Sequence, residues 1–152
     1  MKYYVKVLME YSVFHGRAIR KEYWYFALFH FLFVVIAMLL DKLLGTNFKY
    51  DTNGVITTSD YGWIYSMYVC AVFVPALSVL VRRLHDVGKS GWMMLIVFIP
   101  MIGAIWLLVL LCTKSNDYDN DWGPNPNPVP IVEEVAEIEE KEISDESIIT
   151  EL

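Results

Sequence analysis

The chain contains three long apolar runs separated by short polar segments. The runs cover residues 23–40, 61–81 and 91–112, and none of them contains Asp, Glu, Lys or Arg. Each is close to the roughly 18–20 apolar residues that an α-helix needs to cross the hydrocarbon of a bilayer. The pattern predicts an all-α integral membrane bundle of three transmembrane helices.

The segments outside these runs predict smaller elements. Residues 1–22 are expected to form a cytoplasmic interfacial segment. Within it, residues 1–13 place apolar side chains at helical spacing among charged ones, which indicates a short N-terminal interfacial helix. Residues 49–57 contain Asn53-Gly54, a strong tight-turn signal, and favour a small β-hairpin, although two strands alone are only marginally stable. Residues 113–152 combine a proline-rich spacer with a Glu-rich end, and predict a soluble, acidic and mostly disordered tail.

Composition favours lipid as the surroundings of the apolar runs. Hydrophobic residues make up 56% of the chain, and its mean hydropathy is +0.40, which exceeds the apolar share of an ordinary soluble domain. The formal net charge of -6 arises in residues 127–152, which hold nine Asp and Glu against one Lys. An acidic balance gives no support to nucleic-acid binding, which needs a basic face.

The positions of Lys and Arg predict the orientation in the membrane. Eight of them precede the first run or lie between the second and third runs, and four lie in the other polar segments. The positive-inside rule then places the N-terminus in the cytoplasm and the tail outside. The first run ends without small residues at a cleavage site, so we expect it to remain as a signal anchor.

Three stretches are more specific than generic membrane sequence. They are residues 14–24 (FHGRAIRKEYW), residues 82–92 (RRLHDVGKSGW) and residues 120–126 (NDWGPNP). Together with Pro75 and Pro100, they resemble the bacterial inner-membrane family called domain of unknown function 805. The resemblance covers roughly residues 14–126 and implies a small protein of the bacterial inner (plasma) membrane. The family has no established activity to carry over.

The basic residues of the first two stretches form the main candidate site. Two arginines are expected to end the second helix, and a serine is placed to cap the third, whose free N–H groups attract anions. The two clusters could converge on one anion such as a phosphate-bearing lipid headgroup. Alternatively, they serve only as topology determinants, with Asp86 and Glu22 neutralising neighbouring arginines. The candidate residues are Arg17, Arg20, Lys21, Arg82, Arg83, His85, Lys89 and Ser90.

Three residues inside the apolar runs are further candidates. His30 is an intramembrane polar group, either functional or neutral and hydrogen-bonded to a neighbouring helix. Pro75 and Pro100 are expected to kink adjacent spans at similar depth, free a carbonyl in each and shape a small cleft. These residues would serve the alternative function, a small transporter or channel subunit acting as a homo-oligomer.

Catalytic and metal motifs are not recognisable in the sequence. Residues 88–90 (GKS) resemble the end of a nucleotide phosphate loop, but Arg83 stands where its first glycine belongs. Asp117, Asp119 and Asp121 alternate as in a calcium loop, but its glycine lies at 123 instead of 122, and Pro128 stands where its glutamate belongs. Cys70 and Cys112 have the context of apolar fillers. We therefore expect a protein without enzymatic activity, cofactor or metal, which engages membrane lipids or partner proteins through a basic cytoplasmic face.

Overall fold

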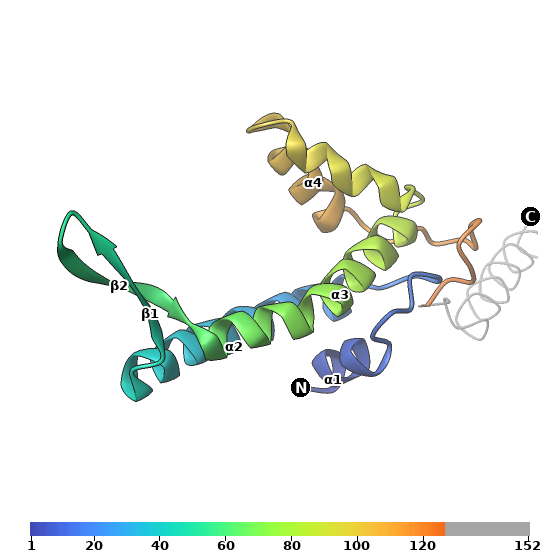
Figure 1. The fold of residues 1–152 in the computed structure, drawn as a ribbon. Coiled ribbons are helices and arrows are strands. Elements are labelled where there is room, and N and C mark those ends of the chain that lie inside the picture. The colour runs from blue at the N-terminus through green and yellow to red at the C-terminus, as the bar shows by residue number, and fades with distance from the viewer. Residues whose placement is uncertain (127–152) are drawn as a thin grey trace, which may run out of the picture.

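The structure is a computed structural model that describes residues 1–126, and the Glu-rich part of the predicted tail lies outside these residues. Five helices and one β-hairpin follow one another in the described part of the chain (Figure 1). Their order is α1 (Lys2–Met9), α2 (Arg20–Leu44), β1 (Asn47–Thr52), β2 (Val55–Gly62), α3 (Trp63–Asp86), the 3₁₀ helix η1 (Gly91–Phe98) and α4 (Ile102–Cys112).

Helices α2 and α3 form an antiparallel pair that is the long axis of the molecule (Figure 1). They contain 25 and 24 residues, so each is roughly 36–38 Å long at about 1.5 Å per residue. This exceeds the hydrocarbon thickness of about 30 Å. Within residues 1–126, these are the two helices long and apolar enough to cross a membrane. Helix α2 contains the whole first predicted span, and α3 contains residues 63–81 of the second, whose first two residues belong to β2.

The third apolar run is not the single helix that we predicted. The chain forms the 8-residue η1, turns at Pro100 and Met101, and then forms the 11-residue α4. Proline removes a helical N–H and disfavours helical backbone in the residue before it, and Met101 adopts a positive φ of 63°. Helix α4 therefore folds back along η1 as a hairpin (Figure 1). Three transmembrane helices are therefore not confirmed, and residues 1–126 contain two candidate spans and this hairpin.

Residues 113–126 return to the end of the molecule where α2 begins and α3 ends. The Asn116 N–H donates to the Asp86 carbonyl at 3.1 Å, and the Asn120 side chain donates to the His85 carbonyl at 2.9 Å. The three predicted spans would place this segment across the membrane from the loop after α3. The hairpin places it beside that loop instead.

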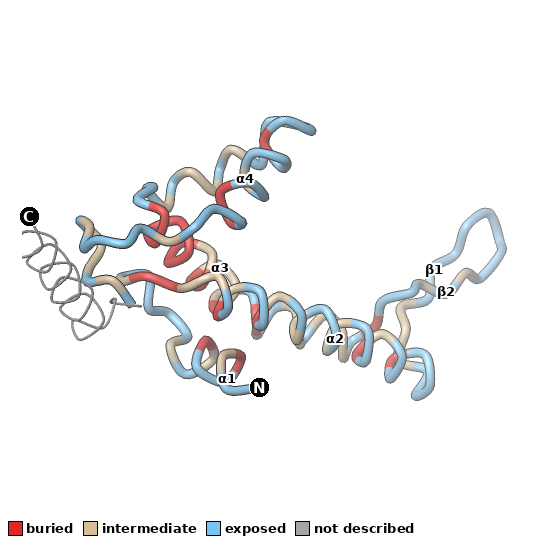
Figure 2. The backbone as a smooth tube through the Cα atoms, turned by 180° about the vertical axis from the view of Figure 1, so that it is seen from behind, coloured by how far each residue is buried: buried red, intermediate tan, exposed pale blue. Residues whose placement is uncertain are grey.

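Helix α1 packs on the α2–α3 pair through an aromatic cluster. The buried Tyr4 ring stacks on Phe26 at 5.4 Å between centroids and also contacts Phe33. Its hydroxyl lies 3.2 Å from that of Tyr68. Buried residues gather at the end of the molecule that holds α1 and the end of α3, while most of α2 is exposed (Figure 2). The exposed surface of α2 is largely apolar, as expected for a helix surrounded by lipid.

The predicted β-hairpin is confirmed at the opposite end of the molecule. Strands β1 and β2 pair antiparallel, and Asn53 and Gly54 both have positive φ in the turn between them, as that turn type requires. The fold is therefore not strictly all-α. Asp41, fully buried near the end of α2, accepts hydrogen bonds from the N–H groups of Ile64 and Tyr65 at 3.0 and 2.8 Å. It thus caps the start of α3 from a neighbouring helix.

Candidate functional site

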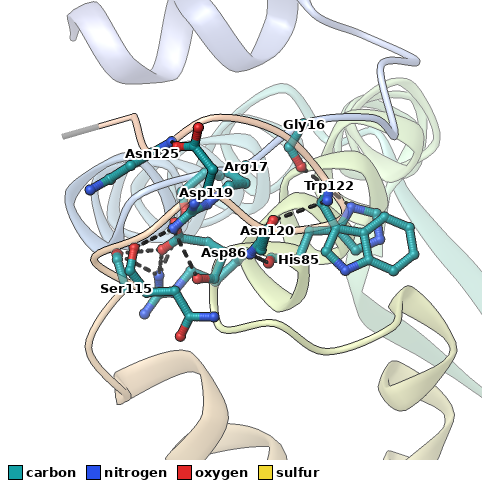
Figure 3. Close-up of polar contacts among 12 residues, drawn as sticks. Gly16, Arg17, His85, Asp86, Ser115, Asp119, Asn120, Trp122 and Asn125 are labelled. Carbon is teal, nitrogen blue, oxygen red and sulfur yellow. Dashed lines mark hydrogen bonds and ion pairs between the residues drawn. The ribbon is translucent and has the colours of Figure 1, made fainter. Parts of the chain in front are cut away.

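The three stretches singled out in the sequence meet at one end of the α2–α3 pair (Figure 3). The segment before α2 contributes Arg17, the end of α3 contributes His85 and Asp86, and the segment after α4 contributes Asn120 and Trp122. The sequence predicts that the first two stretches share a face. It does not predict that the third joins them, because the predicted third span would carry it across the membrane.

Asp86 is the centre of a buried group of charges. Its side chain is fully buried and accepts from Arg17 Nε at 3.1 Å, from Arg83 Nη1 and from the Ser115 hydroxyl. Arg17 also donates to the carbonyls of Asn116 and Tyr118 at 2.6 and 2.8 Å. Buried charges persist only when they are paired and hydrogen-bonded. Arg17 and Arg83 are therefore occupied by protein acceptors.

The same arginines hold the end of α4 in place. Arg83 donates to the carbonyls of Leu111, at 3.2 Å, and Thr113, and Arg20 Nε donates to the Thr113 carbonyl at 2.8 Å. The last carbonyls of a helix have no partner inside it and form its negative pole. The guanidinium groups satisfy these carbonyls and fix the end of α4 next to the end of α3.

A second buried group of charges lies between α1, α2 and α3. Arg82 pairs with Glu10 and with Glu22, whose Oε1 lies at 3.0 Å, and Lys6 Nζ lies 2.6 Å from Glu22 Oε2. Glu22 and Arg82 are almost completely buried. Within residues 1–126, Arg82 Nε and Nη2 have no hydrogen-bond partner. The four side chains carry two positive and two negative charges, so the group is electrically balanced.

His85 is covered by Trp122 from the segment after α4. Their rings are stacked, with centroids 3.8 Å apart and planes 2° from parallel. His85 Nδ1 lies 3.3 Å from the Gly16 carbonyl, and the Asn120 side chain bridges the His85 carbonyl and the Trp122 N–H at 2.9 and 3.0 Å (Figure 3). His85 thus links all three converging stretches.

An open groove next to these buried groups contains three further basic residues, Arg20, Lys21 and Lys114. It has a volume of about 310 Å³ and lies where α2 begins and the segment after α4 passes. Lys21 and Lys114 are exposed in it, and Lys114 pairs with Asp117 at 2.8 Å. The lining residues are Ile19, Arg20, Lys21, Lys114, Ser115, Asp117 and Asn125. We refer to this feature as the basic groove.

The predicted anion-binding residues therefore fall into separate places. Arg17, Arg82, Arg83 and His85 are buried and have protein partners, whereas Arg20 and Lys21 line the basic groove. Lys89 and Ser90 lie in the exposed loop before η1. The Ser90 hydroxyl accepts from the Trp92 N–H at 3.4 Å, which confirms the predicted cap. Sequence reasoning missed Lys114 and Ser115, because a third span over residues 91–112 would place them on the opposite side of the membrane from Arg20 and Lys21.

The structure also shows the surroundings of His30 and Pro75, two of the candidates inside the apolar runs. His30 stacks between Phe26 and Tyr68 and lies 3.0 Å from the Tyr68 hydroxyl, which agrees with the hydrogen-bonded alternative. Pro75 lies inside α3, and the Ala71 carbonyl that it frees accepts from the Tyr11 hydroxyl at 2.8 Å.

Pro100 instead lies at the tip of the η1–α4 hairpin, outside either helix. The predicted pair of kinks at matching depth, with a cleft between them, is therefore wrong.

Comparison with known proteins identifies the family. The family described as "Protein of unknown function (DUF805)" matches residues 11–124. The chain belongs to this family. The DUF805 match contains the first two converging stretches completely and most of the third, and it stops before the Glu-rich segment. The resemblance noted in the sequence is confirmed.

Relatives of this DUF805 chain are named as membrane proteins. Inner membrane protein YhaH of Escherichia coli (strain K12) is 39% identical over 130 residues, which cover 86% of this chain and 100% of that protein. Inner membrane protein YhaI of the same strain is 36% identical over 126 residues, covering 83% and 96%. No solved structure matches the chain. The relatives and the apolar α2 and α3 together indicate an inner-membrane protein.

Proposed function

We propose that this DUF805 protein is a non-enzymatic component of the bacterial inner membrane that binds the phosphate of anionic lipid headgroups in the basic groove. The observation that carries the proposal is the convergence of Arg20, Lys21 and Lys114 on one open groove of about 310 Å³. Within residues 1–126, Asp117 is the one acidic residue in its lining. The lining therefore has a net positive charge of about two, and it complements a phosphate group.

The groove lies at the level where headgroups are expected. Arg20 is the first residue of α2, and the exposed aromatic residues Trp24 and Tyr25 follow about one turn later. Tryptophan and tyrosine favour the boundary between headgroups and hydrocarbon. A lipid whose acyl chains lie along α2 can therefore place its phosphate beside Arg20 and Lys21.

The local backbone also favours an anion. The α2 N-terminus has Ile19 as its capping residue, and no side chain caps its first N–H groups. These groups form the positive pole of the helix and attract negative charge. Lys114 and Asp117 are both more than half exposed, so their ion pair is weak and a phosphate can take the place of the Asp117 carboxylate.

Native mass spectrometry of the purified full-length protein, co-solubilised with phosphatidylglycerol and phosphatidylcholine, tests the proposal. The variant K21E/K114E changes two exposed groove residues, and the matched control K42E/K49E changes two exposed lysines near the β-hairpin. We expect K21E/K114E to retain fewer phosphatidylglycerol molecules than the wild type, and K42E/K49E to retain the same number.

Equal retention by all three proteins would refute the groove as the site. An equal loss in both variants would also refute it, because binding would then follow net charge alone. Reversal of Arg82 and Arg83 is unsuitable for this test, since both are buried in ion pairs and their loss would disturb the fold.

A further inference from the structure

We propose that the chain crosses the membrane twice, with α2 and α3, and that the η1–α4 hairpin enters and leaves the bilayer on one side. Residues 113–126 then lie on the same face as the segment before α2. The inference goes beyond the lipid-binding proposal and is independent of whether the basic groove binds any lipid.

The lengths of the two short helices do not allow a crossing. Helix η1 has 8 residues, or about 16 Å at the 3₁₀ rise of roughly 2 Å per residue. Helix α4 has 11 residues, or about 17 Å at roughly 1.5 Å per residue. The hydrocarbon core is about 30 Å thick, so a hairpin of this depth reaches only about half-way.

Close packing keeps the hairpin closed. Gly103 at the start of α4 lies so near the Ile96 carbonyl of η1 that a Cβ atom at this position would overlap it. At the other end of the hairpin, Gly91 packs on the Val81 side chain of α3, and the Thr113 carbonyl accepts from Arg83. Both ends of the hairpin are thus attached near the same end of α3.

Several backbone N–H groups at the tip of the hairpin have acceptors within the tip. Irregular backbone at membrane depth is costly when its N–H groups have no acceptor. Here the N–H groups of Ile99, Ile102 and Gly103 donate to the carbonyls of Ile96, Pro100 and Ile99 at 2.8–2.9 Å. Pro100 has no N–H to satisfy. These bonds lower the cost of placing the turn among lipid chains.

A crossing would also separate the partners of the buried arginines. Arg17 donates to the carbonyls of Asn116 and Tyr118, and Asp86 accepts from Ser115. If residues 91–112 crossed the membrane, all three partners would move to the opposite side. Arg17, itself buried, would then lose two acceptors, which a cation in a nearly dry environment needs.

The distribution of positive charge supports the same topology. A hairpin places nine of the eleven Lys and Arg of residues 1–126 on one face and two on the other. A third crossing would move Lys114 to the opposite face. The positive-inside rule therefore favours the hairpin and makes the nine-residue face cytoplasmic. The nine residues are Lys2, Lys6, Arg17, Arg20, Lys21, Arg82, Arg83, Lys89 and Lys114.

Cysteine accessibility in intact cells tests the topology. In the full-length chain with Cys70→Ser and Cys112→Ser, a single cysteine replaces Tyr118 after α4, Lys89 before η1, or Val55 next to the β-hairpin turn, all exposed positions. A membrane-impermeant maleimide is applied before and after the cells are opened. We expect the cysteine at 55 to react in intact cells, and those at 89 and 118 to react only after opening.

Two results would overturn the inference. Reaction at 118 in intact cells, together with 55, would show that residues 91–112 cross the membrane. A cysteine at Met101, the exposed tip residue, is expected to stay unreactive in intact and opened cells, because hydrocarbon covers it. Reaction at 101 together with 118 in opened cells would show that the hairpin lies outside the bilayer.

Discussion

Asp86→Ala should be one of the most destabilising single substitutions in this protein. Asp86 is fully buried and is the shared acceptor of Arg17, Arg83 and Ser115. Removal of one partner from a buried ion pair costs about 3–5 kcal/mol, because a charge is left buried without compensation. The hydrogen bonds that are lost at the same time belong to the same group and do not add independently. We therefore expect the free energy of unfolding to fall by about 3–5 kcal/mol.

Reversible unfolding in mixed detergent, followed by tryptophan fluorescence, measures this loss. Trp122 is a suitable reporter because its ring stacks on His85, next to Asp86. Asp117→Ala is the matched control, since its ion pair with Lys114 is largely exposed and exposed pairs contribute at most about 1 kcal/mol. If Asp86→Ala lost no more stability than Asp117→Ala, the buried charge group would not hold the converging stretches together.

Three further substitutions probe other parts of the fold. Gly103→Leu should open the hairpin, because the leucine side chain would overlap the Ile96 carbonyl. A pair of cysteines, one introduced in η1 and one in α4, measures the opening: the disulfide between them should be lost in Gly103→Leu, and undiminished disulfide formation would contradict the prediction. Asp41→Ala should lower the midpoint of thermal unfolding more than Asp41→Asn does, because the asparagine keeps one acceptor oxygen for the N–H groups at the start of α3. Equal midpoints in the two variants would contradict the capping role. Trp122→Ala should lower the free energy of unfolding by about 1 kcal/mol, because the stack on His85 is lost. Hydrogen exchange should become faster only in residues 113–126, and unchanged exchange there would contradict the packing of this segment.

The apolar pattern was sufficient to place the α2–α3 pair, because two long uncharged runs leave few alternatives to helices in lipid. The Asn53-Gly54 turn and the Ser90 cap were also predictable, since each depends on residues close in sequence. The hairpin in the third run was not predictable in the same way. Its apolar content is that of a transmembrane helix, and the break depends on contacts such as that between Gly103 and Ile96.

The candidate site was predicted only in part for the same reason. The basic stretches were recognised, and the alternative in which Asp86 and Glu22 neutralise arginines describes the pairs that the structure contains. The sequence could not show which of the basic residues are buried and which are accessible, because arginines and lysines occur together within the same two short stretches. Nor could it place Lys114 beside Lys21, since that neighbourhood depends on the folded-back hairpin.

The most direct test of the proposed function is a titration of the detergent-solubilised protein with short-chain phosphatidylglycerol, with phosphatidylcholine as the zwitterionic comparison. Each basic residue near a membrane surface contributes about 1 kcal/mol of attraction to anionic lipid. Loss of the two lysine charges in K21E/K114E should therefore weaken binding by at least about 2 kcal/mol, or roughly 30-fold, whereas K42E/K49E should match the wild type. Equal affinities for the two lipids, or an unchanged phosphatidylglycerol affinity in K21E/K114E, would contradict the account.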